Sequence, residues 1–463
     1  MKPYQQYKAS GISWIGEIPH HWSKLKLRSI LKPVTVRNRP DLPLLSVVRE
    51  KGVILRNVEN KNENHNYIPD DLSNYKLVQK GQLAINKMKA WQGSYGLSNY
   101  EGIVSPAYYV FSISSGVFNY FFHLALRSKV YVPFFTSASD GVRVGQWDLN
   151  LNRMKEIPFY LPSNEEQQQI ARYLDWKTTK INKFIKAKKK LIALLKEQKQ
   201  NIINEAVTKG INPYVKMKKS GVDWLGEIPE HWEIRKLRFL INGKLKYGAN
   251  SSGIEYKANL PRYIRITDFN SNGELDSKNK ISLSIDNFEQ YLLTEGDLLL
   301  ARSGATVGKV FQCKNLTEPS CYAGYLIKAI PNTNLILSDY LYFYTQSLVY
   351  ANWKNKILIK ATIENISAEK YSQLLVTLPN INEQKLIIQK IITETSLTNK
   401  IILQAEKEIK LIQEYQARLI SDVVTGKIDV RSIKIPDFEP IEGDAEISDE
   451  GITEELVKED IEE

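Results

Sequence analysis

The chain has few of the residues from which metal and redox sites are usually built. Its 463 residues include only two cysteines, Cys313 and Cys321, and five histidines. The spacing of the cysteines fits no zinc pattern, and the histidines do not cluster near them. Two cysteines in so long a chain also favour a reducing compartment without a disulfide framework. The composition therefore argues against a zinc domain and against a disulfide-rich secreted fold.

Long apolar runs are missing as well. No stretch of the sequence approaches the ~20 apolar residues that a membrane span needs, and the first ten residues, MKPYQQYKAS, contain no apolar signal core. With 43% hydrophobic and 25% charged residues, the composition is close to that of an average globular protein. We expect a soluble, cytoplasmic protein with no membrane partner.

Acidic residues are scarce in the body of the chain because many of them lie at its end. Residues 436–463 contain thirteen Asp or Glu and one Lys, so a net charge of +11 divides into −12 there and +23 in the rest. A surplus of that size favours a polyanionic partner, nucleic acid before membrane, because neutralised phosphates release counterions. A generally cationic, soluble surface is the alternative. We expect the acidic end to be a solvated, disordered tail.

Catalytic motifs are present only in incomplete form. Pro40-Asp41 and residues 59–61 spell a nuclease pattern, but in a polar setting unsuited to a buried metal-binding strand. Residues 304–309 resemble a phosphate loop with one residue too few between the glycines and a valine in place of the magnesium-binding Ser or Thr. A turn that brings backbone amides and Lys309 to a phosphate remains open. Residues 212–214 lack the second proline of an NPPY motif, so we predict no catalytic residue.

The chain instead contains a long repeat. Residues 7–22 read YKASGISWIGEIPHHW, and 210 positions later residues 217–232 read MKKSGVDWLGEIPEHW. So long a period excludes a solenoid and indicates a duplicated domain, which binds its ligand at two places. For the repeated segment we favour a structural docking plug, in which Glu17 or Glu227 caps a neighbouring amide, over a contact surface for a partner protein.

A second repeat has an offset of 217. Residues 161–209 align without a gap on residues 378–426, with apolar residues at intervals of three, four and seven. Each copy has a glutamate in its first turn, Glu166 or Glu383, and over forty residues without internal proline or glycine. We predict two helices of ~43 residues and ~65 Å, packed as an antiparallel coiled coil.

The regions between these helices are different in character. Residues 23–160 and 233–377 contain short alternating or apolar runs between turns, which predict strands of mixed sheets. Helical patterns interrupt them at 119–129 and 338–350. The predicted fold is α+β, with two mixed α/β recognition domains separated by two long antiparallel coiled-coil helices in a pseudo-two-fold duplication. The predicted divisions are domains at 1–160 and 211–377, helices at 161–210 and 378–427, and an acidic tail at 428–463.

Basic residues interleaved with aromatics and amides are the positive sign of function. They gather in loops 85–96 and 301–309, which follow the parallel openings KGQLAI and EGDLLL, and in a second pair of positions, Arg143 and Lys360, related by 217. Arg and Gln suit guanine and adenine edges, and Lys, Ser and Thr suit phosphates. A solvated turn with Trp91 anchored in the core is the alternative. The candidate DNA-binding residues are Lys87, Lys89, Trp91, Gln92, Ser94, Arg143, Gln146, Arg265, Arg302, Ser303, Thr306, Lys309 and Lys360.

The order of these motifs resembles the specificity subunit of a type I restriction-modification enzyme over nearly the whole length. The resemblance rests on WIGEIPHHW and WLGEIPEHW at the two starts, GQLAINKMKAWQGSYG with IVSPAYYVF behind it, GQWDLN before the first helix, and LPSNEEQQQIA and LPNINEQKLII opening the helices. Each motif is moderately specific, and their duplicated order is highly specific.

The resemblance implies that each domain reads one half of a bipartite DNA target, while the two helices set the distance between the halves and dock two methyltransferase subunits. Motor-nuclease restriction subunits join for cleavage. It also implies that this chain binds no cofactor and that S-adenosylmethionine, ATP and magnesium belong to the partners. Two other classes stay open, a stand-alone DNA methyltransferase or nuclease and a coiled-coil adaptor without a nucleic-acid role.

Overall fold

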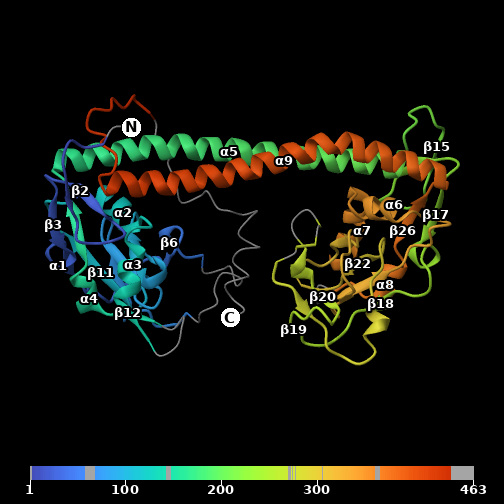
Figure 1. The fold of residues 1–463 in the computed structure, drawn as a ribbon, viewed down its shortest axis with the longest axis horizontal. Coiled ribbons are helices and arrows are strands. Elements are labelled where there is room, and N and C mark those ends of the chain that lie inside the picture. Colours follow the sequence, from blue (N-terminus) through green and yellow to red (C-terminus); the bar gives the residue numbers. More distant parts are fainter. Residues whose placement is uncertain are drawn as a thin grey trace. The chain divides into compact units, whose positions relative to one another are not determined.

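The structure is a computed structural model that describes residues 3–57, 68–141, 147–269, 273, 275–276, 278–304, 306–359 and 365–438. The chain divides into two compact units (Figure 1). Unit 1 comprises Met1–Lys188 with Glu408–Glu463, and unit 2 comprises Lys189–Lys407. Each long helix therefore contributes one part to each unit.

Unit 1 is built on a four-stranded antiparallel sheet in the order β4-β11-β8-β9. Its strands are β4 (Leu31–Pro33), β8 (Leu83–Asn86), β9 (Tyr95–Leu97) and β11 (Tyr108–Ile113). All four residues of β8 are buried, because this strand lies between two others and is covered on both faces. The loop that joins β8 to β9 is the first basic loop of the sequence.

Helices and a second group of strands cover this sheet. Ile85 and Phe111 belong to a buried cluster with Phe122 of α2, Phe135 of α3 and Ile170 of the first long helix. The other elements of unit 1 are β1 (Tyr7–Ala9), β2 (Glu17–Pro19), β3 (Ser23–Lys26), α1 (Leu27–Ile30), β5 (Leu45–Val48), β6 (Gly52–Leu55), β7 (Lys76–Val78), η1 (Ala90–Gln92), β10 (Gly102–Val104), α2 (Asn119–Arg127), α3 (Val132–Ser137), β12 (Ser139–Asp140), β13 (Asp148–Leu149), α4 (Leu151–Lys155) and β14 (Pro158–Leu161).

Unit 2 repeats the sheet of unit 1. The strands β18 (Lys246–Tyr247), β25 (Leu326–Ala329), β22 (Leu298–Ala301) and β23 (Val310–Gln312) follow the order β18-β25-β22-β23, and all their pairings are antiparallel. The central strand β22 is again fully buried. The equal strand order confirms the internal duplication that the repeats predict.

Unit 2 also has a sheet that the sequence patterns do not reveal. Its order is β19-β21-β20-β24, and β20 and β24 are parallel. The predicted helix at 338–350 is in fact two helices, because Ser347 breaks the pattern and its hydroxyl accepts from Tyr350 N. The other elements of unit 2 are β15 (Met217–Lys219), β16 (Glu227–Pro229), β17 (Glu233–Lys236), η2 (Leu237–Phe239), β19 (Ile254–Glu255), β20 (Arg262–Ile264), η3 (Ile266–Asp268), β21 (Ile281–Ser282), η4 (Phe288–Tyr291), β24 (Ser320–Tyr322), α6 (Ser338–Thr345), α7 (Leu348–Ile359), α8 (Ala368–Ser372) and β26 (Leu375–Leu378).

The two long helices are α5 (Asn164–Lys209) and α9 (Ile381–Val424), with 46 and 44 residues. Each begins beside a capping side chain. Ser163 Oγ accepts from Glu166 N at 3.3 Å, and Asn380 Oδ1 accepts from Glu383 N at 2.9 Å. The helices lie close to the predicted bounds because caps, apolar spacing and the absence of proline and glycine all agree.

The two helices are antiparallel in each unit. In unit 1, Gln416 Nε2 donates to Asn182 Oδ1 at 3.2 Å, and Lys188 Nζ lies 2.7 Å from Glu408 Oε2. In unit 2, Lys196 Nζ lies 3.4 Å from Glu406 Oε1, and Lys199 Nζ donates to Asn399 Oδ1 at 2.8 Å. Rising residue numbers on α5 meet falling numbers on α9, which confirms the predicted antiparallel pair.

The segment after α9 does not begin as a solvated tail. Val430 is completely buried in the core of unit 1. Gln169 Nε2 of α5 donates to Val430 O at 2.9 Å and to Ile433 O at 2.8 Å. The predicted tail at 428–463 therefore includes residues that are part of unit 1, because their apolar side chains and carbonyls have partners there.

Candidate nucleic-acid interface

The loop between β8 and β9 carries the unit 1 candidates. Lys87 Nζ donates to Asp148 Oδ2 at 2.8 Å, and Lys87 O accepts from Leu149 N at 2.8 Å. The hydrogen bond to the Asp148 carboxylate raises the pKa of Lys87. Lys89 is exposed and forms no ion pair with any described residue. The loop therefore offers one cation held by a neighbouring strand and one free to meet a phosphate.

Two indole rings meet beside this loop. The ring centroids of Trp91 and Trp147 lie 5.2 Å apart, and Trp91 Nε1 donates to Met88 O at 3.2 Å. Trp91 and Gln92 are partly exposed, whereas Ser94 is only 2% exposed. Trp91 is therefore not a core anchor. The burial of Ser94 weighs against its predicted contact with DNA.

Arg302 in unit 2 is held in place by its backbone and by an aromatic ring. Its backbone N donates to Tyr325 O at 3.0 Å, and its backbone O accepts from Ile366 N at 2.8 Å. The guanidinium lies over the Tyr247 ring at 4.9 Å from the centroid, and the Tyr247 hydroxyl accepts from Ala368 N at 3.0 Å. Arg302 makes no ion pair with a described residue. It is a positioned cation without an acidic partner.

The phosphate-loop interpretation of residues 304–309 is wrong for three of its amides. Val307 N donates to Gly304 O, Gly308 N to Ala301 O and Lys309 N to Thr306 O, each at 2.9 Å. These N–H groups close the hairpin between β22 and β23 and are not available to a phosphate. The side chains remain candidates for a phosphate contact, since Ser303 and Thr306 are partly exposed and Lys309 is exposed.

The other candidates are not part of these loops. Arg265 Nη2 lies 2.8 Å from Asp268 Oδ1, and Arg265 N donates to Asp268 Oδ2 at 2.7 Å, so this residue stabilises its own turn beside the second sheet. Arg143, Gln146 and Lys360 lie outside the described residues.

The repeated tryptophan segments dock within the fold, as the favoured interpretation of the sequence predicted, but their partner in each unit, the first turn of a long helix, was not predicted. In unit 1 the Glu166 carboxylate accepts from Trp22 Nε1 at 3.1 Å and from Tyr4 OH at 2.6 Å, and His21 Nε2 lies 2.8 Å from it. In unit 2, His231 Nε2 lies 3.0 Å from the Glu383 carboxylate. In each unit the tryptophan segment, residues 7–22 or 217–232, therefore contacts the glutamate in the first turn of a long helix.

A neighbouring glutamine strengthens each junction. Gln167 Oε1 accepts from Phe118 N at 2.8 Å, and Gln167 Nε2 donates to Pro162 O at 3.0 Å. Gln384 makes the same bonds to Leu337 N and Pro379 O, at 2.8 and 2.9 Å. The capping role predicted for Glu17 or Glu227 was wrong, because neither carboxylate has a hydrogen-bond partner among the described residues.

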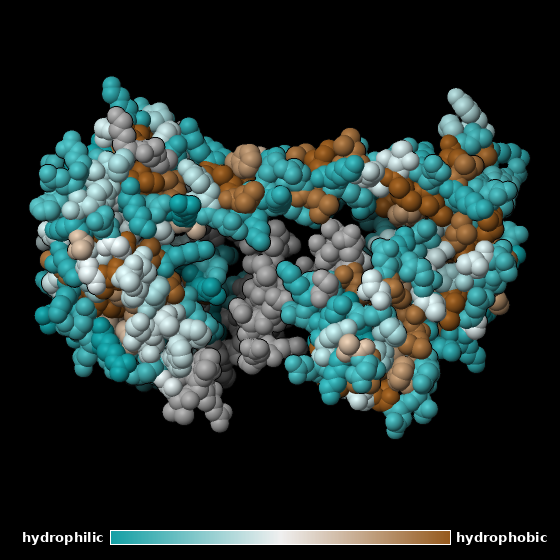
Figure 2. Space-filling view, viewed as in Figure 1, coloured by the Kyte–Doolittle hydropathy of each residue, from teal (hydrophilic) through white to brown (hydrophobic). Residues whose placement is uncertain are grey.

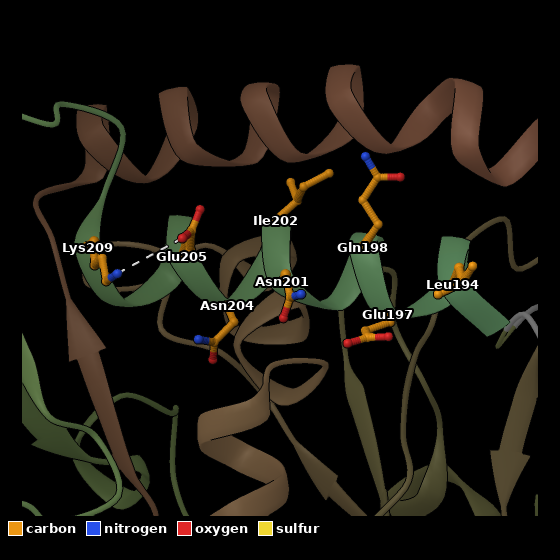
Figure 3. A pocket seen from close by; sticks show the side chains of 8 residues that line it. All are labelled: Leu194, Glu197, Gln198, Asn201, Ile202, Asn204, Glu205 and Lys209. Atoms are coloured by element: carbon orange, nitrogen blue, oxygen red, sulfur yellow. Dashed lines mark ion pairs between the residues drawn. The ribbon is translucent and has the colours of Figure 1, made fainter.

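The long helices expose apolar side chains. Figure 2 shows hydrophobic surface along α5 and α9. In unit 2, α5 lines a shallow hollow of about 460 Å³ with Leu194, Ile202 and polar residues up to Lys209. Figure 3 shows Gln198 and Ile202 pointing towards α9. The exposed apolar residues are Phe184, Leu191 and Leu194 on α5, and Leu386, Ile392, Leu397, Ile401, Leu403, Leu411 and Tyr415 on α9.

In the part of the chain that the structure describes, no three or more His, Cys, Asp or Glu side chains come together in a way that could hold a metal ion. None of the helices among those residues has the length and apolar character needed to cross a membrane.

A model of the family described as "Type I restriction modification DNA specificity domain" matches residues 22–211 and again residues 229–411. The chain belongs to this family. The two matches of the specificity domain fall on the two halves of the internal duplication, and each includes one basic loop. The first also includes all of α5, and the second includes most of α9.

Relatives of this specificity family cover much of the chain. The MjaVIII specificity subunit of Methanocaldococcus jannaschii is 25% identical over 317 residues, 67% of this chain and 71% of the relative. A subunit of the same organism, named as the putative MjaX specificity subunit, is 23% identical over 90% of this chain and 96% of its own length. A solved chain from work on complex assembly and conformational transition of the type I R-M system has a TM-score of 0.61 at 13% identity, over 89% of this chain and 99% of that one, which shows the shared fold.

Proposed function

We propose that this chain is the DNA-specificity subunit of a type I restriction-modification complex and that residues 1–160 and 211–377 each read one half of a bipartite double-stranded target. One observation carries the proposal. The β8–β9 and β22–β23 loops occupy the same place in two sheets of equal strand order, yet carry different side chains. A common scaffold with different loops suits the reading of two different half-sites.

The loop residues divide by chemistry. Arg302 suits the bidentate contact to a guanine edge, and Gln92 suits adenine. Lys87 and Lys89 suit phosphates, and Trp91 offers an aromatic face. The remaining candidates, Arg143, Gln146, Arg265, Ser303, Thr306, Lys309 and Lys360, keep their proposed place at the interface, and Ser94 stays a weaker candidate because it is buried.

The proposed protein partners are two methyltransferase subunits, docked along the helices at 161–210 and 378–427, with motor-nuclease subunits joining through them. The exposed apolar side chains of α5 and α9 support this, because such surface on a helix usually marks a contact with another chain. In this proposal the chain itself is non-catalytic and cytoplasmic. S-adenosylmethionine, ATP and magnesium are bound by the partners. The acidic residues from 439 to 463, predicted to form a tail, lie outside the described residues.

Domain exchange tests this function. We expect that replacing residues 23–160 with the equivalent segment of another specificity subunit changes one half of the methylated sequence and leaves the other half intact. Single-molecule sequencing of methylated positions in cells that carry the subunit with its methyltransferase measures this. A map in which both halves change contradicts the proposal.

The two rival classes have their own readouts. Methylation or cleavage by the purified chain alone identifies a stand-alone enzyme. Failure to bind duplex DNA even in the presence of methyltransferase subunits identifies an adaptor without a nucleic-acid role.

A further inference from the structure

The repeated tryptophan segments allow a comparison within one molecule. Residues 7–22 and 217–232 share ten identical positions in sixteen, although the sequences that surround them have diverged. A residue identity that survives such divergence is expected where the fold needs it or where both copies meet the same partner. The identical residues are Lys8, Ser10, Gly11, Trp14, Gly16, Glu17, Ile18, Pro19, His21 and Trp22, with their counterparts from Lys218 to Trp232.

The fold accounts for most of these identities. Ser10 Oγ donates to Gly16 O at 2.6 Å, and the φ values of Gly16 and Gly226 are +75° and +69°, which favour glycine. Trp22 and Trp232 are completely buried. The isoleucine and proline between these residues are also buried in both copies, and each histidine contacts the glutamate of a long helix.

Glu17 and Glu227 are not explained in this way. They are the first residues of β2 and β16, where their backbones pair with Ala9 and Lys219. Both side chains are exposed, and neither forms an ion pair or hydrogen bond with a described residue. Glutamate has no preference for strands. Within the described residues, the fold therefore gives no reason for a carboxylate at these two positions.

The surroundings of Glu17 are suited to a partner. A hollow of about 510 Å³ in unit 1 is lined by Trp14 and Glu17 among others, and also by Lys427, whose Nζ lies 3.8 Å from Asp422 Oδ1. Trp14 is 44% exposed although its ring lies 4.8 Å from that of Phe134, so one part of the indole is anchored and another is available. An aromatic face beside an unpaired carboxylate suits a Lys or Arg side chain. In unit 2 the equivalent ring, Trp224, already has Lys356 Nζ of this chain over it, at 5.2 Å from the centroid.

The net charge of residues 1–435 indicates whether the partner is DNA or a protein. Residues 1–435 carry a net charge of +23, and an exposed carboxylate repels DNA phosphates. Two such carboxylates, one in each copy, therefore mark a protein contact made twice. We propose that the Glu17 and Glu227 loops are equivalent docking points for a basic segment of the methyltransferase subunit, one copy per loop. This inference rests on the proposed function and adds contacts beyond the long helices.

The test counts bound methyltransferase subunits. Native mass spectrometry and titration compare the full-length wild-type chain with Glu17→Lys, Glu227→Lys and the double variant. We expect each single variant to weaken one of the two binding events by about tenfold, and the double variant to weaken both. Glu17→Gln should show a smaller effect in the same direction. Binding of DNA by the chain alone should not decrease in any variant.

Glu230→Lys is the matched control. It makes the same charge reversal in the same segment at a position where the first copy has His20. It also removes the exposed ion pair of Glu230 with Lys216, and methyltransferase binding should be unchanged. Equal binding by wild type and double variant, with both folded by circular dichroism, overturns the inference alone. An equal loss in the Glu230→Lys control also overturns it. A wild-type chain that binds no methyltransferase subunit contradicts the proposed function and the inference together.

Discussion

In both units a tryptophan segment meets a glutamate in the first turn of a long helix. The two contacts use equivalent residues, but the glutamate of unit 1 is more deeply buried and accepts more hydrogen bonds. Glu166 is 5% exposed and accepts hydrogen bonds from Tyr4 and Trp22 besides its contact with His21. Glu383 contacts His231, while Trp232 Nε1 has no partner among the described residues. Tyr214 stands where the repeat places Tyr4, yet it is 93% exposed.

The difference has a physical cause in the segment after α9. The Arg431 guanidinium lies over the Tyr4 ring at 4.7 Å and forms an ion pair with Asp429 at 2.7 Å. Burial, with the hydrogen bond to Glu166, raises the pKa of Tyr4, so its hydroxyl stays protonated as a donor. In unit 2 the chain runs from α5 directly into residues 211–217, and Tyr214 has no such cover. The duplicated motif thus provides the same potential hydrogen-bond donors in both units. The segment that follows α9 in unit 1 determines how many of them bind the glutamate carboxylate.

The largest expected difference is in the loss of stability when Glu166 or Glu383 is replaced by alanine. Glu166→Ala leaves the Trp22 and Tyr4 donors buried without an acceptor, and each such donor costs about 1–3 kcal/mol. We expect a loss of about 2–5 kcal/mol for Glu166→Ala and about 1 kcal/mol or less for the exposed contact in Glu383→Ala. Denaturant unfolding followed separately in the two units by hydrogen exchange measures this. Equal losses would show that the closure of the first junction has no energetic consequence.

The neighbouring glutamines should behave alike. Gln167 and Gln384 are at most 1% exposed and have matching bonds on both sides of the amide. We expect Gln167→Ala and Gln384→Ala each to cost about 2 kcal/mol, because each leaves a part-buried backbone N–H and a buried proline carbonyl unpaired. The same hydrogen-exchange experiment measures both. A difference above about 1 kcal/mol would mean that the junctions differ beyond their carboxylates.

The two basic loops should differ in DNA affinity. Arg302 is already held by Tyr247 and by its backbone, so it loses little side-chain entropy on binding, whereas Lys89 forms no ion pair with a described residue. We expect Arg302→Ala to cost about 1–2 kcal/mol of binding and Lys89→Ala about 0.5 kcal/mol, with the salt slope reduced by about one charge in each. Fluorescence anisotropy over a salt titration measures both quantities. Unchanged affinity removes the residue from the interface.

A pH dependence is expected in unit 1. Burial, aided by Arg127, lowers the pKa of His123 to about 3, and its Nδ1 accepts from Leu97 N at 3.1 Å. A base with a lowered folded-state pKa stabilises the fold above its unfolded pKa of about 6.5, and that stability is lost as the pH falls towards 3. Relative to His123→Asn, which keeps an acceptor, the wild type should lose about 1 kcal/mol between pH 7.5 and pH 5.5. Parallel curves for the two proteins would contradict this.

Local sequence patterns were sufficient for the scaffold. The helices at 164–209 and 381–424 follow from uninterrupted apolar spacing, and the paired openings before Lys87 and Arg302 located the matching hairpins. Both rest on neighbours in sequence, which a pattern can reveal. The division into recognition domains, helices and tail stays a prediction, since the compact units pass through both helices.

Long-range contacts were beyond prediction. Glu166 meets Tyr4 across 162 positions, and Arg302 lies over a tyrosine from a strand more than fifty positions earlier. Neither partner leaves a local trace in the sequence. The amides of residues 307–309 were misjudged for a related reason, because glycine spacing does not show whether a loop bonds to itself or to a ligand.

The glycines that end the long helices have a further consequence. Gly210 and Gly426 have φ values of +77° and +76°, and a methyl group on either would crowd Trp232 or Trp22. A Cβ at Gly210 would lie 3.1 Å from Trp232, which follows in the next stretch of chain. A Cβ at Gly426 would meet Pro19 and Trp22, which lie some four hundred positions earlier in the sequence. A direct connection along the chain is therefore not needed for the end of a long helix to pack against a tryptophan segment. We expect that cleaving the backbone at the exposed Tyr214 leaves α5 packed against Trp232, because α9 packs against Trp22 without such a connection.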